Sequence, residues 1–202
     1  MKMKKILYLH GFASSGASGT VDILRKEFWG IDAAHRASVL APDLPVDPAV
    51  ALPMVKELAA KELPDLIIGT SMGGMYAQQL RGFLRICVNP SFTISKKYSV
   101  LYVGKHKWLN KRRDGALEFH VTKETIAHFQ EMEAHQFDGI TVEDRMLCHG
   151  LFGADDEMMP EVRPIFDSHY PGMGLVFQGG HRMNADVVNH TLLPFIRKLN
   201  VI

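Results

Sequence analysis

Five residues around Ser71 have the types and spacing of a serine nucleophile held in a tight turn. Gly69-Thr70-Ser71-Met72-Gly73 matches Gly-x-Ser-x-Gly, the pattern in which a sharp strand-to-helix turn lifts a serine hydroxyl above a sheet. The glycines are needed because such a turn leaves no room for side chains beside the strained serine backbone. An apolar run at residues 65–68 precedes the pattern, and a helical pattern at residues 72–83 follows it. The sequence therefore indicates Ser71 as a nucleophile.

A serine hydroxyl needs a base and an orienting carboxylate, and both follow Ser71 in the order Ser, Asp, His. Gly179-Gly180-His181 comes directly after the last predicted strand, and Gly153-Ala154-Asp155-Asp156 comes after the strand before it. Loops at the carboxyl edge of a parallel sheet lie close together. We interpret His181 as the general base and Asp156 as the carboxylate that orients it. This chemistry requires neither a metal ion nor a cofactor.

The negative charge that develops on a substrate carbonyl oxygen needs two backbone donors. One is expected from Met72, the residue after the nucleophile, and the other from the loop after the first strand. His10-Gly11-Phe12 forms that loop, and its small glycine allows a backbone N–H to face Ser71. The sequence predicts an oxyanion hole made by the amides of Phe12 and Met72.

Short apolar runs alternate with longer amphipathic ones, as in a parallel sheet covered by helices. Six runs predict strands, at residues 5–10, 38–42, 65–70, 85–89, 146–152 and 174–177. Helices are expected over residues 20–28, 48–61 and 72–83, and a closing helix over 184–199 must start, kink or split at Pro194. Right-handed crossovers then give a mostly parallel, doubly wound sheet of about six strands in one α/β domain, residues 1–202.

Residues 92–143 interrupt this alternation, because about fifty residues are too many for a simple crossover between consecutive strands. We expect an insertion that acts as a helical lid above the sheet. Its second half, residues 122–136, has the pattern of an amphipathic helix. Its first half carries seven basic residues: Lys96, Lys97, Lys105, Lys107, Lys111, Arg112 and Arg113.

The composition excludes several classes of protein. The 202 residues are 47% hydrophobic and 22% charged, which is typical of a folded domain with a sizeable core. A net charge of +1 gives no global field that would recruit nucleic acid or a membrane. The apolar runs are too short to span a bilayer, and His10-Gly11 ends the first run before a signal-peptide core forms. A cytoplasmic location is therefore expected.

Four elements of the chain resemble the small YqiA-like esterases of the α/β-hydrolase superfamily. They are Leu7-Tyr8-Leu9-His10-Gly11-Phe12, residues 69–74, Val88-Asn89-Pro90 and Gly179-Gly180-His181. Their order and spacing match over nearly the whole chain. The resemblance implies a minimal α/β-hydrolase core that cleaves a carboxylic ester or thioester without a cofactor, with Ser71, the acidic residue after Gly153 and His181 as its triad.

The expected partner is therefore a small acyl ester or thioester, and two alternative functions remain open. The same triad serves an acyltransferase, and a catalytically silent protein of this fold could instead bind a ligand or partner through the insertion. The basic residues of the insertion either select an anionic substrate or only keep the insertion itself soluble. A histidine and glutamate stripe at helical spacing is interpreted as a solvated face rather than a metal site: His120, Glu124, His128, Glu131 and His135.

The spacing also selects one of two adjacent carboxylates. Asp156 stands three residues after Gly153 and three before Met159-Pro160, the expected start of a helix, and neighbouring side chains point in different directions. We expect Asp156→Asn to lower turnover by orders of magnitude through misorientation of His181, and Asp155→Asn to stay within roughly tenfold of wild type. Steady-state kinetics on an ester measure both. The reverse ranking would assign the carboxylate to Asp155.

Overall fold

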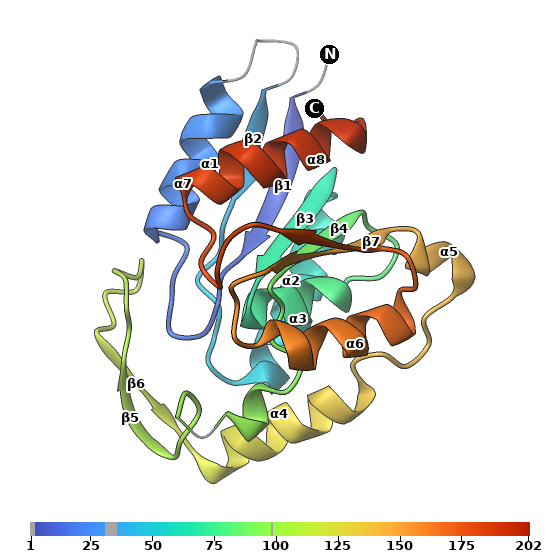
Figure 1. Cartoon of the computed structure of the whole chain (residues 1–202). Helices are drawn as coiled ribbons and strands as arrows, with labels where there is room; N and C mark the ends of the chain where they lie inside the picture. The colour runs from blue at the N-terminus through green and yellow to red at the C-terminus, as the bar shows by residue number, and fades with distance from the viewer. Residues whose placement is uncertain (1–2, 31–35, 98) are drawn as a thin grey trace.

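A six-stranded sheet forms the centre of the computed structural model, which describes residues 3–30, 36–97 and 99–202 (Figure 1). The strand order is β2-β1-β3-β4-β7-β8, and every neighbouring pair is parallel. The strands are β1 (Lys4–Leu9), β2 (Ala37–Leu40), β3 (Leu66–Thr70), β4 (Arg85–Val88), β7 (Cys148–Gly153) and β8 (Gly174–Phe177). The predicted α/β fold with six sheet strands is confirmed.

The strand order reverses direction at β1. The chain passes from β1 to β2 on one side and then crosses to β3 on the other side of β1, after which β4, β7 and β8 continue outward. In open α/β sheets, ligands bind outside the carboxyl ends of the strands at such a reversal. The loops after β1 and β3 meet at this point, and they carry Phe12 and Ser71.

Helices cover both faces of the sheet, as in the predicted doubly wound arrangement (Figure 1). One face is covered by α1 (Gly19–Gly30) and by the C-terminal segment of α7 (Ala185–Val187), η2 (Val188–Leu192) and α8 (Leu193–Lys198). The other face is covered by α2 (Pro48–Glu62), α3 (Met72–Gln78) and α6 (Met159–His169).

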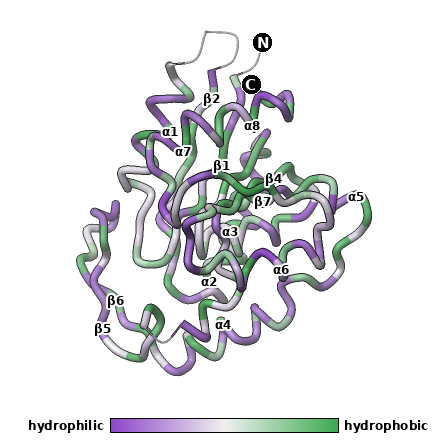
Figure 2. The backbone as a smooth tube through the Cα atoms, viewed as in Figure 1, coloured by the Kyte–Doolittle hydropathy of each residue, from purple (hydrophilic) through white to green (hydrophobic). Residues whose placement is uncertain are grey.

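The alternation of side chains along β1 shows why two separate cores form. Ile6 and Tyr8 pack into the core under α1, whereas Leu7 and Leu9 pack into the core under α2 and α3. Both faces of a parallel sheet are buried, so its strands are apolar at every position rather than at every second one. Figure 2 shows these hydrophobic stretches gathered in the strands at the middle of the molecule.

Two helices differ from their expected form. α3 ends at Gln78 rather than at residue 83, because the chain tightens into turns there and Gly82 takes a left-handed φ of 79°. The closing helix is continuous from Ala185 to Lys198 but widens into the π-helical turn η2 just before Pro194. A π turn shifts the hydrogen-bonding register, which accommodates a proline without ending the helix. Within the described residues, no helix is long and apolar enough to cross a membrane.

The insertion between β4 and β7 combines helices with a small hairpin. It contains η1 (Ile94–Lys96), β5 (Gly104–Lys107), β6 (Glu118–Val121), α4 (Lys123–His135) and α5 (Val142–Arg145). The amphipathic helix expected at residues 122–136 is confirmed as α4. The antiparallel hairpin of β5 and β6 was not expected, since its strands are four residues long and carry the charges of an exposed ribbon.

A buried ion pair fastens the end of the insertion to the sheet. Arg85, at the start of β4, is fully buried, and its Nη1 donates to Asp144 Oδ1 at 2.9 Å. Arg81 Nη1 reaches the other carboxylate oxygen at 3.1 Å. Burial by itself raises the pKa of Asp144, but the hydrogen bond and charge of Arg85, together with hydrogen bonds from the N–H of Gly82 and from Arg81, hold this pKa below its ordinary value.

This pair yields a stability prediction. Asp144→Asn leaves the buried guanidinium of Arg85 uncompensated, so we expect the free energy of unfolding at pH 7 to fall by about 3 kcal/mol. Because the folded-state pKa of Asp144 is lowered, its contribution is present above the unfolded pKa of about 3.9 and is lost as the pH falls further. Urea denaturation at pH 7 and pH 3 measures both effects.

The control for this prediction is an exposed ion pair. Glu118→Gln removes the partner of Lys105, whose side chain is 58% exposed, and such pairs contribute about 1 kcal/mol or less. If the free energy of unfolding falls equally in the two variants, the buried Arg85–Asp144 pair stabilises the fold no more than an exposed pair does.

Candidate active site

Ser71 lies in the sharp turn that its sequence pattern predicts. The residue follows β3 and precedes α3 with φ 53° and ψ −121°, a strained conformation for a residue with a side chain. A Cβ on Gly69 would lie 2.1 Å from the carbonyl oxygen of Gly73, and a Cβ on Gly73 would lie 2.0 Å from the carbonyl oxygen of Leu9. Neither glycine can be replaced without moving α3 away from the sheet.

Asp156 and His181 are brought together by the loops after β7 and β8. His181 Nδ1 lies 2.8 Å from Asp156 Oδ2, and the Asp156 side chain is 4% exposed. The second carboxylate oxygen, Oδ1, accepts the backbone N–H of Met158 at 3.0 Å. A carboxylate accepts a hydrogen bond from Nδ1–H, so in the neutral imidazole Nε2 is the nitrogen without a hydrogen.

Asp155 faces away from the histidine. Its Oδ2 accepts a hydrogen bond from Gln178 Nε2 at 2.9 Å, and the residue is exposed. The backbone turn after β7 therefore separates the two adjacent carboxylates, and the hydrogen bond joins His181 to Asp156.

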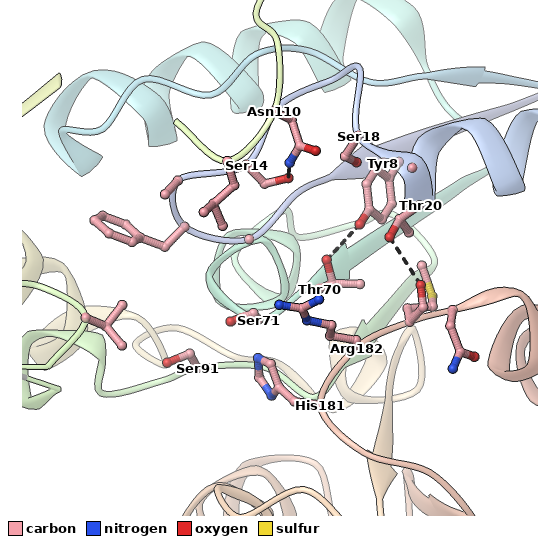
Figure 3. Close-up of a pocket in the computed structure, with 18 of the residues that line it drawn as sticks. Tyr8, Ser14, Ser18, Thr20, Thr70, Ser71, Ser91, Asn110, His181 and Arg182 are labelled. Atoms are coloured by element: carbon pink, nitrogen blue, oxygen red, sulfur yellow. Dashed lines mark hydrogen bonds between the residues drawn. The ribbon is translucent and has the colours of Figure 1, made fainter. Parts of the chain in front are cut away.

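Ser71 and His181 line the same cavity, which has a volume of about 820 Å³. Figure 3 shows both side chains at its wall, with Ser91 nearby. Among the hydrogen bonds of the described residues, none joins Ser71 Oγ to His181. Catalytic hydrogen bonds of this kind often form only when substrate is bound.

The loop after β1 lies directly against the serine. A Cβ on Gly11 would be 3.3 Å from Ser71 Cβ. The backbone amides of Phe12 and Met72 have no acceptor among the hydrogen bonds within the described part of the chain. The Phe12 ring packs edge-on against His106 of β5 and Phe119 of β6. The hairpin of the insertion thus packs against the loop that carries one predicted oxyanion donor.

His10 holds this loop in place from below. Its Nε2 accepts the backbone N–H of Leu44 at 3.0 Å, and its Nδ1 donates to the carbonyl oxygen of Gly11 at 2.8 Å. Burial lowers the pKa of His10 to about 4. The imidazole is therefore neutral near pH 7, as these two hydrogen bonds require.

Asn89, which was not among the expected site residues, connects the two loops that carry the predicted acid and base. Its Nδ2 donates to the carbonyl oxygens of Gly180 and His181 at 2.9 and 3.1 Å, and its Oδ1 accepts the N–H of Gly153 at 2.7 Å. The residue is 3% exposed and has a left-handed φ of 43°, which asparagine tolerates well. The sequence signal that could have identified this role is the position of Asn89, a polar residue directly after the buried strand β4.

The basic residues of the insertion lie mostly away from the cavity. Of the seven, Lys97 lines it. Lys105 pairs with Glu118, and Arg112 pairs with Asp114 while its guanidinium stacks on Trp108. Most of these basic side chains thus lie outside the cavity, where they are solvated or make contacts that stabilise the insertion.

The histidine and glutamate stripe does not form along one helix. His120 lies in β6, before α4 begins. His128 pairs with Asp47, and His135 pairs with Glu131 and Asp138. Over the described ranges, no three His, Cys, Asp or Glu side chains gather as a metal site requires.

Comparison with known sequences and structures places this arrangement in context. Residues 5–191 match the profile of a family described as "Uncharacterised protein family (UPF0227)". The comparison with curated protein sequences gives no match.

Solved structures share the fold at low sequence identity. Est1E from Butyrivibrio proteoclasticus has a TM-score of 0.69 at 14% identity, over 100% of this chain and 90% of its own. Alpha/beta hydrolase domain-containing protein 10 from mouse has a TM-score of 0.64 at 16% identity, and the match covers 98% of this chain and 91% of the mouse protein. The thioesterase domain from the curacin biosynthetic pathway has a TM-score of 0.60 at 14% identity, and the match covers 98% of this chain and 91% of that domain. These likenesses establish the α/β-hydrolase fold.

The position of Asn89 yields a prediction. Asn89→Gly removes the three side-chain hydrogen bonds but tolerates the left-handed backbone, so the loops of Asp156 and His181 lose their buried side-chain bridge and keep only the direct contacts between them. We expect kcat for ester hydrolysis to fall by about 10- to 100-fold with a smaller change in KM, because a misplaced base slows the chemical step. Steady-state kinetics over a range of pH measure this change.

Asn200→Gly is the matched control, because Asn200 also has a left-handed φ, 54°, and lies near the C-terminus, away from the cavity. Equal kcat losses in the two variants, or a fall in Asn89→Gly that follows only the loss of folded protein, would contradict a positioning role.

Proposed function

The chain belongs to protein family UPF0227, the YqiA-like family that its sequence resembles, and we propose that it is a serine hydrolase that cleaves carboxylic esters or thioesters. The observation that carries this proposal is the hydrogen-bonded pair of Asp156 and His181 lying at the cavity that also holds Ser71. A cavity of about 820 Å³ is in the range that takes a small-molecule substrate.

The reaction begins with acylation of the serine. Ser71 Oγ attacks the substrate carbonyl carbon while His181 Nε2 takes the hydroxyl proton, and Asp156 stabilises the resulting imidazolium. The amides of Phe12 and Met72 donate to the oxyanion of the tetrahedral intermediate. As the bond to the leaving oxygen or sulfur breaks, the imidazolium returns its proton to that atom.

Water then completes the cycle. His181 removes a proton from a water molecule, whose oxygen attacks the acyl-enzyme carbonyl. The second intermediate then collapses, the bond to Ser71 Oγ breaks, and the imidazolium returns its proton to that oxygen, which releases the carboxylic acid. If an alcohol or thiol enters instead, the same steps transfer the acyl group.

Two features support catalysis over silent binding. The strained backbone of Ser71 is costly, and such strain persists at positions where it serves a function. The fold is shared with a thioesterase domain and with Est1E, whose structure has been determined with ferulic acid bound. A protein that only binds a ligand needs neither the strained serine nor the buried carboxylate behind His181.

Labelling with a fluorophosphonate probe tests the proposal. The probe forms a covalent bond with an activated serine, so we expect mass spectrometry to find it on Ser71. We expect Ser71→Ala to lose labelling and to lower ester hydrolysis by at least about 10³-fold while the protein stays folded. Ser168→Ala, at an exposed position of α6, is the control for nonspecific labelling.

A panel of acyl esters and thioesters of increasing chain length completes the experiment. Release of free acid identifies hydrolysis, and an acyl product on an added alcohol identifies transfer. Unchanged turnover in Ser71→Ala would reject Ser71 as nucleophile. No labelling and no turnover in the wild type would favour the silent binding protein.

A further inference from the structure

Two permanently charged side chains and one histidine line the cavity among the described residues, and all three are of basic type. Lys97, His181 and Arg182 lie at its wall, whereas no Asp or Glu is found among the described residues that line it. The remaining polar lining consists of hydroxyl and amide groups, such as those of Thr20, Asn110 and Asn184, which are neutral and donate hydrogen bonds. The described lining of the cavity thus offers hydrogen-bond donors and cations but no carboxylate, although the chain as a whole is nearly neutral.

The two permanent cations differ in how their charge is compensated. Lys97 Nζ lies 2.5 Å from Glu161 Oε2, so its charge is already matched. The guanidinium of Arg182 makes no hydrogen bond or ion pair with any described residue. In Figure 3 this side chain extends from the loop after β8 in the direction of Ser71. Arg182 is thus the cation with donors available to a ligand.

The start of α1 lies beside the segment that carries Arg182. Thr20 Oγ1 donates to the carbonyl oxygen of Met183 at 3.2 Å, which fixes the first turn of α1 against the segment that follows His181. The first amides of a helix have no intrahelical acceptor and attract anions. Gly19 and Thr20 line the cavity, and a Cβ on Gly19 would contact nothing within 4 Å.

A buried hydroxyl at the same place lacks a partner. Ser18 precedes the first turn of α1, is 6% exposed and lines the cavity. Its Oγ forms no hydrogen bond with any described residue, although a serine at this position usually caps its helix. An unpaired buried polar group is costly, and an anion at the start of α1 supplies the missing partner.

We propose that the cavity recognises an ester or thioester that carries an anionic group, a carboxylate or a phosphate, and that this group binds between Arg182 and the start of α1. The proposal rests on the serine hydrolase function given above and specifies its substrate class. It assigns the charge selection to the loop after β8 and to α1, rather than to the basic cluster of the insertion.

Matched pairs of neutral and anionic esters test this proposal. An anionic acyl group is tested with mono-4-nitrophenyl adipate against 4-nitrophenyl hexanoate, and an anionic leaving group with 3-acetoxybenzoate against phenyl acetate. We expect the wild type to have the higher kcat/KM on the anionic member of at least one pair. In Arg182→Gln that preference should fall by about tenfold, which corresponds to the loss of one charged hydrogen bond, whereas Arg182→Lys should retain much of it.

Arg25→Gln is the control, since Arg25 is an exposed arginine of α1 that does not line the cavity. An equal fall in the preference for this variant would show that only the overall charge matters. The proposal is overturned if the preference is absent in both pairs or is the same in wild type and Arg182→Gln.

A separate readout distinguishes this outcome from failure of the hydrolase function. Adipate or inorganic phosphate should slow fluorophosphonate labelling of wild-type Ser71 at constant ionic strength, and should slow it less in Arg182→Gln. Labelling that proceeds normally but is insensitive to both anions would refute the anion site while leaving the hydrolase function intact. Absence of labelling would refute the hydrolase function itself.

Discussion

The close approach of α3 to the sheet is the constraint on which the rest of the site depends. Gly73 lies against the carbonyl oxygen of Leu9 in β1, and Gly69 lies against the carbonyl oxygen of Gly73. With no side chains between them, the chain turns from β3 into α3 within one residue. Ser71 absorbs the strain of this turn and is lifted to the point where the strand order reverses, beside the loop after β1.

The other elements of the site are positioned relative to that turn by buried polar contacts. His10 fixes the loop that presents the amide of Phe12, while Asn89 joins the loops that present Asp156 and His181. Each of these polar side chains is buried and fully engaged, which specifies a single arrangement of the loops. Arg85 and Asp144 play a comparable part at the opposite edge of the sheet, where they fasten the end of the insertion. The geometry of the proposed site and the anchoring of the insertion thus depend on different buried polar groups.

The distribution of charge shows why residue counts alone do not identify a binding site. The first half of the insertion carries seven basic residues, yet three of them are paired with carboxylates: Lys97 with Glu161 of α6, Lys105 with Glu118 across the hairpin, and Arg112 with Asp114 two residues away. Arg182 lies far from this basic stretch in the sequence, but its guanidinium N–H groups at the cavity wall have no partner among the described residues. A cation contributes to recognition according to whether it is already neutralised and where it points, and both properties depend on the folded arrangement of its neighbours.

The sequence by itself determined the features that depend on local pattern. Apolar runs gave the six sheet strands, and the glycines around Ser71 gave the elbow, because a strand, a tight turn and a helix each leave a short-range signature. The order of Ser71, Asp156 and His181 followed from loops that leave the same edge of a parallel sheet. Only the tertiary structure decided what depends on contacts between distant segments. These are the bridge from Asn89 to loops about sixty and ninety residues away, the pairing of Lys97 with Glu161, and the small hairpin in the insertion. A polar side chain carries no local sign of the partner it will meet, so its role becomes visible when packing brings that partner within hydrogen-bonding distance.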